Sequence, residues 1–353
     1  MQINWSESME QSFEYYEVDP NTWKDMRIIN TIKSSSLSRD SGAQTLGSAS
    51  IEANEVFGEC YIRIYLIIIQ NKIKHKINLG IYLIQTPTLS FDGKIKSATM
   101  DAYTPLIELK EKLTPIGFTI PKETNILNSA YILVRDNCRA PVVKTVSDKT
   151  LEENFVTGGD ETYLDFISDL LKKAKYELYL DEDGNILFSP EQTLDELQPI
   201  WTYNDDNSSI LYPEISLKND IYGIPNVVEV SYKNDNYSLY SRIVNDDPDS
   251  VTSIQARGRE IVHRDSSPDL PGLPTQEQLD MYATNLLKKL NSVEYEISYS
   301  HGYCPVRVGD CVRLNYNVSG LTGIKAKVTR QTIKCDTGCT VQETAIFTKK
   351  LWK

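Results

Sequence analysis

Four cysteines near the C-terminal end are the side chains best suited to metal chemistry. They could supply the four thiolates of a structural zinc site: Cys304, Cys311, Cys335 and Cys339. No pair among them has the two-residue separation of a zinc knuckle, and Cys335 and Cys339 flank residues 336–338, which are typical of a hairpin turn. A disulfide or simple packing explains the spacing equally well. The sequence therefore leaves pairing and metal binding open, and we assign no metal site.

A second group of potential ligands is the acidic segment Asp181-Glu-Asp-Gly-Asn185. Its oxygen-rich composition suits calcium, but an EF-hand loop needs glycine at its sixth position and a bidentate glutamate at its twelfth. This chain has Ile186 and Gln192 at those positions. Because Asp, Asn and Gly readily form turns, the segment predicts a β-hairpin turn instead.

Residues for nucleophilic or phosphate chemistry are scattered. His75, His263 and His301 lie in unrelated contexts, and no serine lies in a Gly-x-Ser-x-Gly elbow. Gly158-Gly159 precedes a helix but lacks a Lys-Ser/Thr partner, and Asp160-Glu161 would repel a phosphate. Among 49 acidic residues, nothing singles out a carboxylate pair for glycoside hydrolysis. We predict no catalytic residue and no cofactor.

Composition narrows the possible partners. The 353 residues include 37 Lys and Arg against 49 Asp and Glu, a formal net charge of −12. An acidic surface repels phosphate, so stable nucleic-acid binding is not expected. The longest strongly apolar run, residues 61–69, is too short to span a bilayer, so membrane insertion is not expected either. The acidic N-terminus resembles no export signal, which favours reduced thiols and synthesis in a cytoplasm.

The elements that would carry any site are mostly strands. An acidic, aromatic N-terminal arm is followed by four or five strands, among them the β-branched run Tyr61–Ile69. This run becomes apolar at every position, as expected of a strand buried on both faces, and as an open edge it would aggregate. Lys72, Lys74 and Lys76 indicate the solvated face of a strand that blunts an edge. A further strand is expected at 78–86, ending before Pro87.

The middle of the chain has a helical hydrophobic pattern in addition to strand patterns. Residues 163–175 follow a 3.6-residue apolar period with acids first and lysines last, which predicts a helix. A hairpin over residues 176–188 comes next. After residue 200 strands return, including one expected at 253–261, and Thr275-Gln-Glu-Gln278 has the pattern of a capping box that opens a helix.

These segments predict an α+β, β-dominated protein with antiparallel β-barrel or sandwich domains and a mixed α/β insert between them. We expect the following organisation: an N-terminal arm at 1–24, a first β domain at 25–103, a mixed α+β insert at 104–200, and a second β domain at 201–353 with a helix at 275–291.

The order of these segments resembles the baseplate or tail hub proteins of long-tailed bacteriophages and phage-like contractile particles. The motifs that carry this resemblance are Ile51-Glu52, Tyr61-Ile-Arg-Ile64, residues 79–87, Tyr103 to Leu113, Tyr163 to Leu171, Glu177 to Ile186 with Pro190, the helix near Leu286, Pro305 to Leu314 and Ala326-Lys-Val328. Each motif alone is a common turn, cap or strand pattern. The resemblance rests on the order and spacing of these motifs, which together cover nearly the whole chain.

The resemblance implies a structural role rather than an enzymatic one. It implies two tail-tube-like β-barrel domains per chain and a homotrimer that forms a pseudo-sixfold ring. Such a ring would join a sixfold tail tube to a threefold spike or tip and leave a path for DNA or tube contents. The implied partners are the tail tube protein, a spike or tip protein and other baseplate proteins. The implied location is a virion or phage-like particle made in a bacterial host.

Two alternatives from other classes remain. A peptidoglycan-directed tail hydrolase would use two of the many carboxylates, and a β-rich carbohydrate-binding module would use some of the 21 Tyr and 4 Trp. For the hub reading, we expect the apolar strand to form a subunit interface through Tyr61, Arg63, Tyr65, Ile67 and Ile69. Charge reversal at Arg63 should then weaken assembly and leave the monomer folded.

Overall fold

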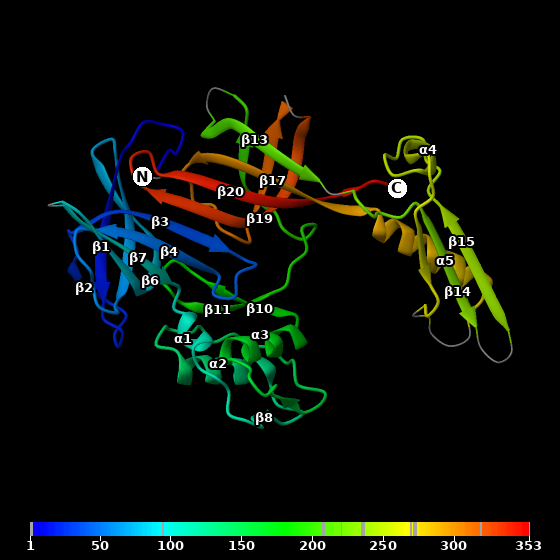
Figure 1. The fold of residues 1–353 in the computed structure, drawn as a ribbon, viewed down its shortest axis with the longest axis horizontal. Coiled ribbons are helices and arrows are strands. Elements are labelled where there is room, and N and C mark those ends of the chain that lie inside the picture. Colours follow the sequence, from blue (N-terminus) through cyan, green and yellow to red (C-terminus); the bar gives the residue numbers. More distant parts are fainter. Residues whose placement is uncertain are drawn as a thin grey trace. The chain divides into compact units, whose positions relative to one another are not determined.

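The computed structural model describes residues 3–93, 95–206, 209–219, 221–233, 237–268, 270, 274–317 and 320–352 (Figure 1). The chain divides into two compact units. The first unit comprises Met1–Ile215 and Tyr299–Ala345, and the second comprises Ser216–Ser298 and Ile346–Lys353. We describe each unit by itself.

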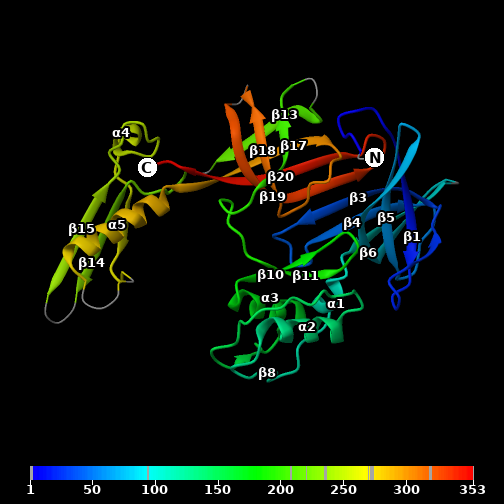
Figure 2. The same cartoon turned by 180° about the vertical axis from the view of Figure 1, so that it is seen from behind.

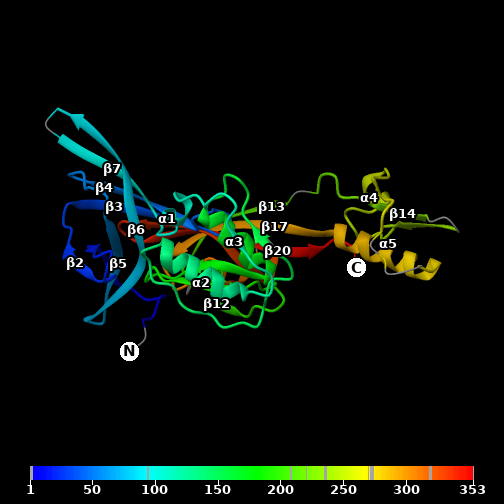
Figure 3. The ribbon, with the colours of Figure 1, turned by 90° about the horizontal axis from the view of Figure 1, so that it is seen from below.

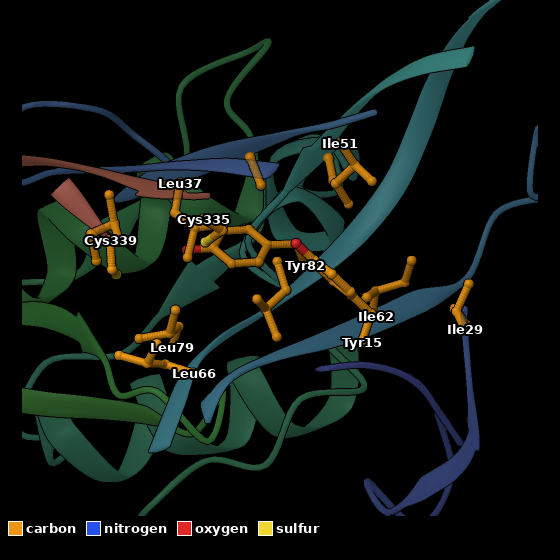
Figure 4. Close-up of a cluster of buried hydrophobic side chains, with 14 of the residues drawn as sticks. Tyr15, Ile29, Leu37, Ile51, Ile62, Leu66, Leu79, Tyr82, Cys335 and Cys339 are labelled. Atoms are coloured by element: carbon orange, nitrogen blue, oxygen red, sulfur yellow. The ribbon is translucent and has the colours of Figure 1, made fainter. Parts of the chain in front are cut away.

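The N-terminal part of the first unit consists of antiparallel strands. They are β1 (Glu10–Val18), β2 (Asp25–Ile28), β3 (Ile32–Asp40), β4 (Gly47–Ala53), β5 (Tyr61–Gln70), β6 (Ile73–Asp92) and β7 (Ile95–Tyr103). Their order in the sheet is β3-β4-β7-β6-β5-β1-β2. Inward-facing side chains from these strands form one buried cluster, which includes Leu37, Ile51, Ile62 and Leu66 (Figure 4). Burial of this apolar surface is the main stabilising contribution to the sheet.

Strands from the second half of the chain extend the same sheet. They are β12 (Pro199–Asn204), β13 (Leu211–Asn219), β17 (Ser292–Gly302), β18 (Cys311–Tyr316), β19 (Leu321–Cys335) and β20 (Thr340–Lys350). β19 pairs with β3 in antiparallel register, from Arg330 opposite Asp40 to Cys335 opposite Ser35. This pairing joins the two ends of the chain in one sheet and confirms the predicted β-dominated α+β class.

The residues between β7 and β12, 104–198, form a smaller α/β part that we call the insert. It contains α1 (Ile107–Lys110), β8 (Thr119–Ile120), α2 (Ile126–Asn137), β9 (Phe155–Val156), α3 (Tyr163–Lys173), β10 (Tyr176–Leu180) and β11 (Ile186–Pro190). The three helices lie together, and the β10–β11 hairpin lies between them and the large sheet (Figure 2). The predicted helix at 163–175 and the hairpin after it are confirmed.

The second unit packs one helix against three strands. Its elements are β14 (Val227–Lys233), β15 (Ser238–Val244), α4 (Ile254–Arg257), β16 (Val262–Asp265) and α5 (Gln276–Leu290). The strand order is β15-β14-β16, with β14 and β16 parallel. Val228 and Val230 of β14 pack against Leu279, Ala283 and Leu287 of α5. The 3.6-residue spacing of these α5 residues places them on one face of the helix.

Two local predictions were wrong. Residues 253–261, expected as a strand, contain the helix α4, because the Ser253 side chain accepts a hydrogen bond from the amide of Ala256 and Gly258 ends the helix at a left-handed φ of 62°. The strand expected at 78–86 is part of one longer strand, β6, which begins at Ile73 and continues to Asp92.

The predicted N-terminal arm contains a strand of the chain's own sheet. β1 pairs with β5 from Glu10 opposite Ile69 to Val18 opposite Tyr61. Tyr15 of β1 is buried in the main apolar cluster, and its hydroxyl hydrogen-bonds the Ser35 hydroxyl at 3.1 Å. These contacts fix residues 10–18 within the same chain.

The capping box of α5 gives a first testable prediction. The Thr275 hydroxyl accepts a hydrogen bond from the Gln278 amide, and the Gln278 side chain accepts one from the Thr275 amide. We expect Thr275→Ala to lower the free energy of unfolding by about 1 kcal/mol, measured by urea unfolding followed by circular dichroism. Thr275→Ser keeps the hydroxyl and should lose much less. Equal losses for both variants would contradict the capping role.

Candidate functional site

The predicted interface strand, β5, is an interior strand of the sheet. β1 pairs along one side of it and β6 along the other, so both of its edges are hydrogen-bonded within the chain (Figure 2). The run Tyr61–Ile69 therefore presents no open edge with which a neighbouring subunit could pair. The reason is that a segment distant in the sequence, residues 10–18, supplies the missing neighbour.

The five predicted interface residues differ in exposure. Tyr61, Arg63 and Ile67 are buried within the chain, and Tyr65 is half-buried. Ile69 is 40% exposed. The assignment of these residues to a subunit interface stays a prediction, and Ile69 is the member with substantial surface to offer to a neighbour.

Arg63 is held by groups of its own chain. Its Nη1 lies 2.6 Å from Asp25 Oδ1, and its Nη2 donates to the Trp23 carbonyl oxygen at 3.0 Å. The Tyr65 hydroxyl donates to the other Asp25 oxygen at 2.9 Å. With the arginine residue 9% exposed, this ion pair is largely shielded from water. Arg63 therefore fastens β2 and the turn before it onto β5.

The lysines of β6 also have partners within the chain. Lys74 Nζ lies 2.9 Å from Glu14 Oε1. Lys76 Nζ lies 4.0 Å and 3.7 Å from the ring centres of Tyr16 and Tyr65, within the range of cation–π attraction. Lys74 and Lys76 thus contact side chains of β1 and β5 across the sheet surface and stay partly exposed to water.

Tyr61 connects the sheet to the insert. Its hydroxyl donates to Glu108 Oε1 of α1 at 2.7 Å, and the Arg139 amide donates to Glu108 Oε2 at 2.7 Å. Although burial opposes it, these hydrogen bonds and the Arg139 guanidinium lower the pKa of Glu108. The Glu108 carboxylate is therefore ionised at neutral pH, and both of its oxygens accept hydrogen bonds that hold α1 in place.

A cluster of buried polar side chains lies where β12, β17, β19 and β20 meet. The sequence placed the three histidines in unrelated contexts, but His301 Nε2 lies 3.3 Å from Glu343 Oε1 and 3.0 Å from the Tyr203 hydroxyl. The Tyr299 hydroxyl donates to Glu343 at 2.8 Å, and Gln331 Nε2 donates to it at 2.5 Å. Each of these five side chains belongs to a buried residue.

The His301–Glu343 pair is ionised. Burial alone would lower the pKa of His301, but hydrogen bonding to Cys304 and Glu343 and the charge of Glu343 raise it to about 10. Burial alone would raise the pKa of Glu343, but His301, Gln331 and Tyr299 lower it. Because both charges lie in the interior, each depends on the other for its stability.

Cys304, His301 and Glu343 together have the residue types of a thiol hydrolase. Their arrangement does not suit that chemistry. Cys304 Sγ is 3.9 Å from His301 Nδ1, and the same nitrogen is 2.6 Å from the Gly302 carbonyl oxygen. Cys304 is 1% exposed and His301 and Glu343 are 0% exposed, so a substrate has no contact with them. The cluster is positioned to hold four strands in register.

The cysteines that the sequence left open are free thiols. Cys304, Cys311, Cys335 and Cys339 are buried and unpaired by disulfides, and burial raises the pKa of Cys335 to about 12. Within the described residues, no group of three or more His, Cys, Asp or Glu side chains could hold a metal ion. The acidic segment 181–185 is a hairpin turn, in which Asp181 Oδ1 accepts the Asn185 amide at 2.8 Å.

An exposed strand surface belongs to a ribbon formed by the ends of β6 and β7. Pairing of β6 with β5 ends at Leu83, and pairing of β7 with β4 ends at Ala98, whereas β6 and β7 continue together to Asp92 opposite Ile95. The ribbon projects beyond the rest of the first unit (Figure 3). Leu89 is 46% and Phe91 is 72% exposed.

This surface was not expected from the sequence, because the strand over residues 78–86 was predicted to end before Pro87. The available signal was the pair Leu89 and Phe91, two apolar residues on alternate positions directly before the Asp-Gly turn. A two-stranded ribbon exposed on both faces is marginally stable alone, and its open edge offers unpaired backbone groups to another strand. It is therefore the strongest candidate interaction surface in the described part of the chain.

Comparisons with solved structures give the fold a context. The chain is similar to the tail protein from Neisseria meningitidis MC58, with a TM-score of 0.61, 10% identity, and coverage of 95% of this chain and 97% of the other. It is also similar to the 43 kDa tail protein of prophage MuSo2 from Shewanella oneidensis, with a TM-score of 0.61 and 10% identity. This match covers 95% of this chain and 98% of the other. This is the fold of phage tail proteins.

A third similarity extends beyond phages. The Francisella PdpA–VgrG complex contains a chain that matches with a TM-score of 0.55 at 10% identity, covering 98% of this chain and 53% of the other. No protein-family model and no curated protein sequence matches this chain. Among the described residues, no helix is both long and apolar enough to cross a membrane.

Proposed function

We propose that the chain is a structural subunit of a phage or phage-like tail, and more specifically a baseplate hub protein. The observation that carries the proposal is the tail-protein fold, matched over 95% of the chain by two tail proteins of nearly the same length. In this proposal three copies form a pseudo-sixfold ring of tube-like β domains. The ring joins a sixfold tail tube to a threefold spike or tip and carries no catalytic step.

The proposed partners follow from the same role. They are a second and third copy of this chain, the tail tube protein, and a spike or tip protein with other baseplate components. The similarity to a chain of a VgrG complex supports the spike side of the proposal. The net charge of −12 suits a ring that DNA passes through without being held, because an acidic wall repels phosphate. The proposed location is the tail of the assembled particle.

The ribbon of β6 and β7 is the proposed contact between copies, in addition to Ile69 of the predicted interface strand. Its apolar side chains and open edge are hidden from water when a neighbouring copy covers them. A contact between two different surfaces of identical chains is heterologous, and it closes into a ring where the rotation between neighbours closes and forms an open filament where it does not. In the proposed hub the rotation closes after three copies.

The oligomeric state tests the proposal directly. We expect light scattering across a concentration series to give a mass of about three times 40.1 kDa. Leu89→Asp combined with Phe91→Asp should raise the concentration at which the trimer dissociates at least tenfold, because charges would replace the buried apolar contacts; tenfold corresponds to about 1.4 kcal/mol.

A matched control uses another exposed apolar residue. Val146 in the insert is 88% exposed, and Val146→Asp should leave the trimer unchanged. A monomer at all concentrations, alone and with tube or spike proteins, would contradict the hub proposal. The hydrolase and carbohydrate-binding alternatives predict turnover of peptidoglycan or binding of sugars, which an assay of the same sample measures.

A further inference from the structure

The acidic turn between β10 and β11 attaches the insert to the large sheet. Glu182 at its tip lies between two arginines of the sheet region. Arg307 Nη2 is 2.7 Å from Glu182 Oε2, and Arg39 Nη2 is 3.6 Å from Glu182 Oε1. The Glu182 side chain is 15% exposed, so water screens these pairs only in part. One carboxylate therefore neutralises two cations across the boundary of the insert.

The residues next to Glu182 fit the turn closely against the sheet. The Asp183 carbonyl oxygen accepts a hydrogen bond from Trp23 Nε1 at 2.8 Å, and its side chain accepts one from Asn78 at 2.8 Å. Gly184 has a φ of +74°, and a Cβ atom there would lie 3.0 Å from the Trp23 ring and 3.2 Å from Ile81. Only glycine satisfies both the backbone conformation and this close approach.

The insert has a core of its own within the first unit. It has its own apolar cluster, which includes Leu127, Phe166 and Leu170 and is distinct from the cluster of the sheet. Its boundary with the sheet is partly apolar, because Ile107 of α1 packs with Tyr61, Ile81 and Leu83, and it includes the hydrogen bond from Tyr61 to Glu108. A second ion pair across the boundary, Arg139 to Glu59 at 3.8 Å, is about half exposed on both sides and contributes little.

The two sides of the Glu182 contact are not equivalent. Arg39 also donates to the Gln331 side chain at 3.1 Å and to the Leu79 carbonyl oxygen at 2.7 Å, so it stays fixed in the sheet without Glu182. The carboxylate, in contrast, is carried by a hairpin turn of the insert. If the contact is broken, the insert is the part that moves.

We propose that Glu182 is a latch: this carboxylate, shared by Arg39 and Arg307, holds the β10–β11 side of the insert against the sheet, and its loss frees that side so that the insert shifts as an intact folded body. The proposal goes beyond a static role in a tail, because it places a conformational switch at the junction between the insert and the sheet. The acidic turn that resembled a calcium loop in the sequence thereby acquires a function.

The test measures a distance between the two bodies. Spin labels are placed at Ser50→Cys on β4 and Lys149→Cys in the insert, two exposed positions, in a Cys60→Ser background. The other native cysteines are buried and should not be labelled. Double electron–electron resonance is recorded for the full chain with Glu182, with Glu182→Gln, and with Glu177→Gln, which removes the same charge from an exposed position of β10.

We expect one narrow distance distribution for the parent chain and for Glu177→Gln, and a longer, broader distribution for Glu182→Gln. Gly184→Ala, which disturbs the fit without changing charge, should broaden it as well. Circular dichroism should show unchanged helix content in every variant. An unchanged distribution in Glu182→Gln would overturn the latch, and so would a loss of helix content, because the insert would then not shift as an intact body.

Discussion

Replacement of Glu343 by glutamine should lower the free energy of unfolding by about 3–5 kcal/mol. The buried carboxylate is the counter-charge of His301 and accepts hydrogen bonds from Tyr299 and Gln331. Its loss leaves an imidazolium without a partner among residues that are 0–2% exposed. The measurement is the urea midpoint and slope, compared with Glu294→Gln, an exposed glutamate of the same strand as His301.

The same pair predicts a pH dependence with a defined sign. The folded-state pKa of His301 is raised to about 10. Ionised His301 therefore contributes fully to the free energy of unfolding below pH 6.5, the ordinary pKa of histidine, and this contribution is lost as pH rises through about 10. The pKa of Glu343 is lowered, so its contribution is complete above 4.5 and is lost as pH falls through the lowered value. The contribution of the pair is therefore greatest between about pH 4.5 and 6.5.

In the Glu343→Gln variant, the stability contribution of His301 should change with pH in the opposite direction. Without the carboxylate, burial disfavours the charged imidazole, so the variant loses stability as pH falls below 6.5 and the unfolded chain takes up the proton. The difference in free energy of unfolding between the parent chain and the variant should thus be largest near pH 5 to 6 and should become smaller toward pH 10. A difference that is constant across this range would show that the pair is not ionised.

Charge reversal at Arg63 should unfold the N-terminal sheet region instead of only weakening assembly. Arg63→Glu would place a second carboxylate next to Asp25, at a residue that is 9% exposed, and would remove the bond to the Trp23 carbonyl oxygen. Loss of one partner of a buried ion pair costs about 3–5 kcal/mol, and like-charge repulsion adds to it. Thermal unfolding and sizing at low protein concentration separate stability from assembly.

Two matched variants sharpen this test. Arg313→Glu reverses the charge of an exposed strand arginine and should leave stability nearly unchanged. Asp25→Arg combined with Arg63→Glu restores opposite charges and should recover part of the loss. A stable Arg63→Glu monomer would restore the original sequence-based expectation that this residue acts only between subunits.

Local signals in the sequence predicted several elements correctly. The helix that begins at Tyr163 follows from its apolar period and from the Thr162 cap, and α5 follows from its capping box. The hairpin around residues 181–185 follows from turn chemistry. Where a short local signal was missed, at Ser253 and Gly258, the expected strand proved to be the helix α4.

The candidate sites depended on partners that are far apart in the chain. Arg63 meets Asp25, 38 residues away, Tyr203 meets Glu343, 140 residues away, and Glu182 meets Arg39 and Arg307. No spacing rule connects such residues. The order of the strands in the sheet also places β5 in the interior, because β1 pairs along one of its edges.

The sequence by itself determined the β-dominated class, the α/β insert and the resemblance to tail proteins, because strand alternation, helix period and turn residues act over a few positions. The tertiary structure alone decided which strands are interior, which charges are paired and which surface projects as a ribbon. The physical reason is that burial and ion pairing depend on distances in space, and these are fixed only when distant strands pair.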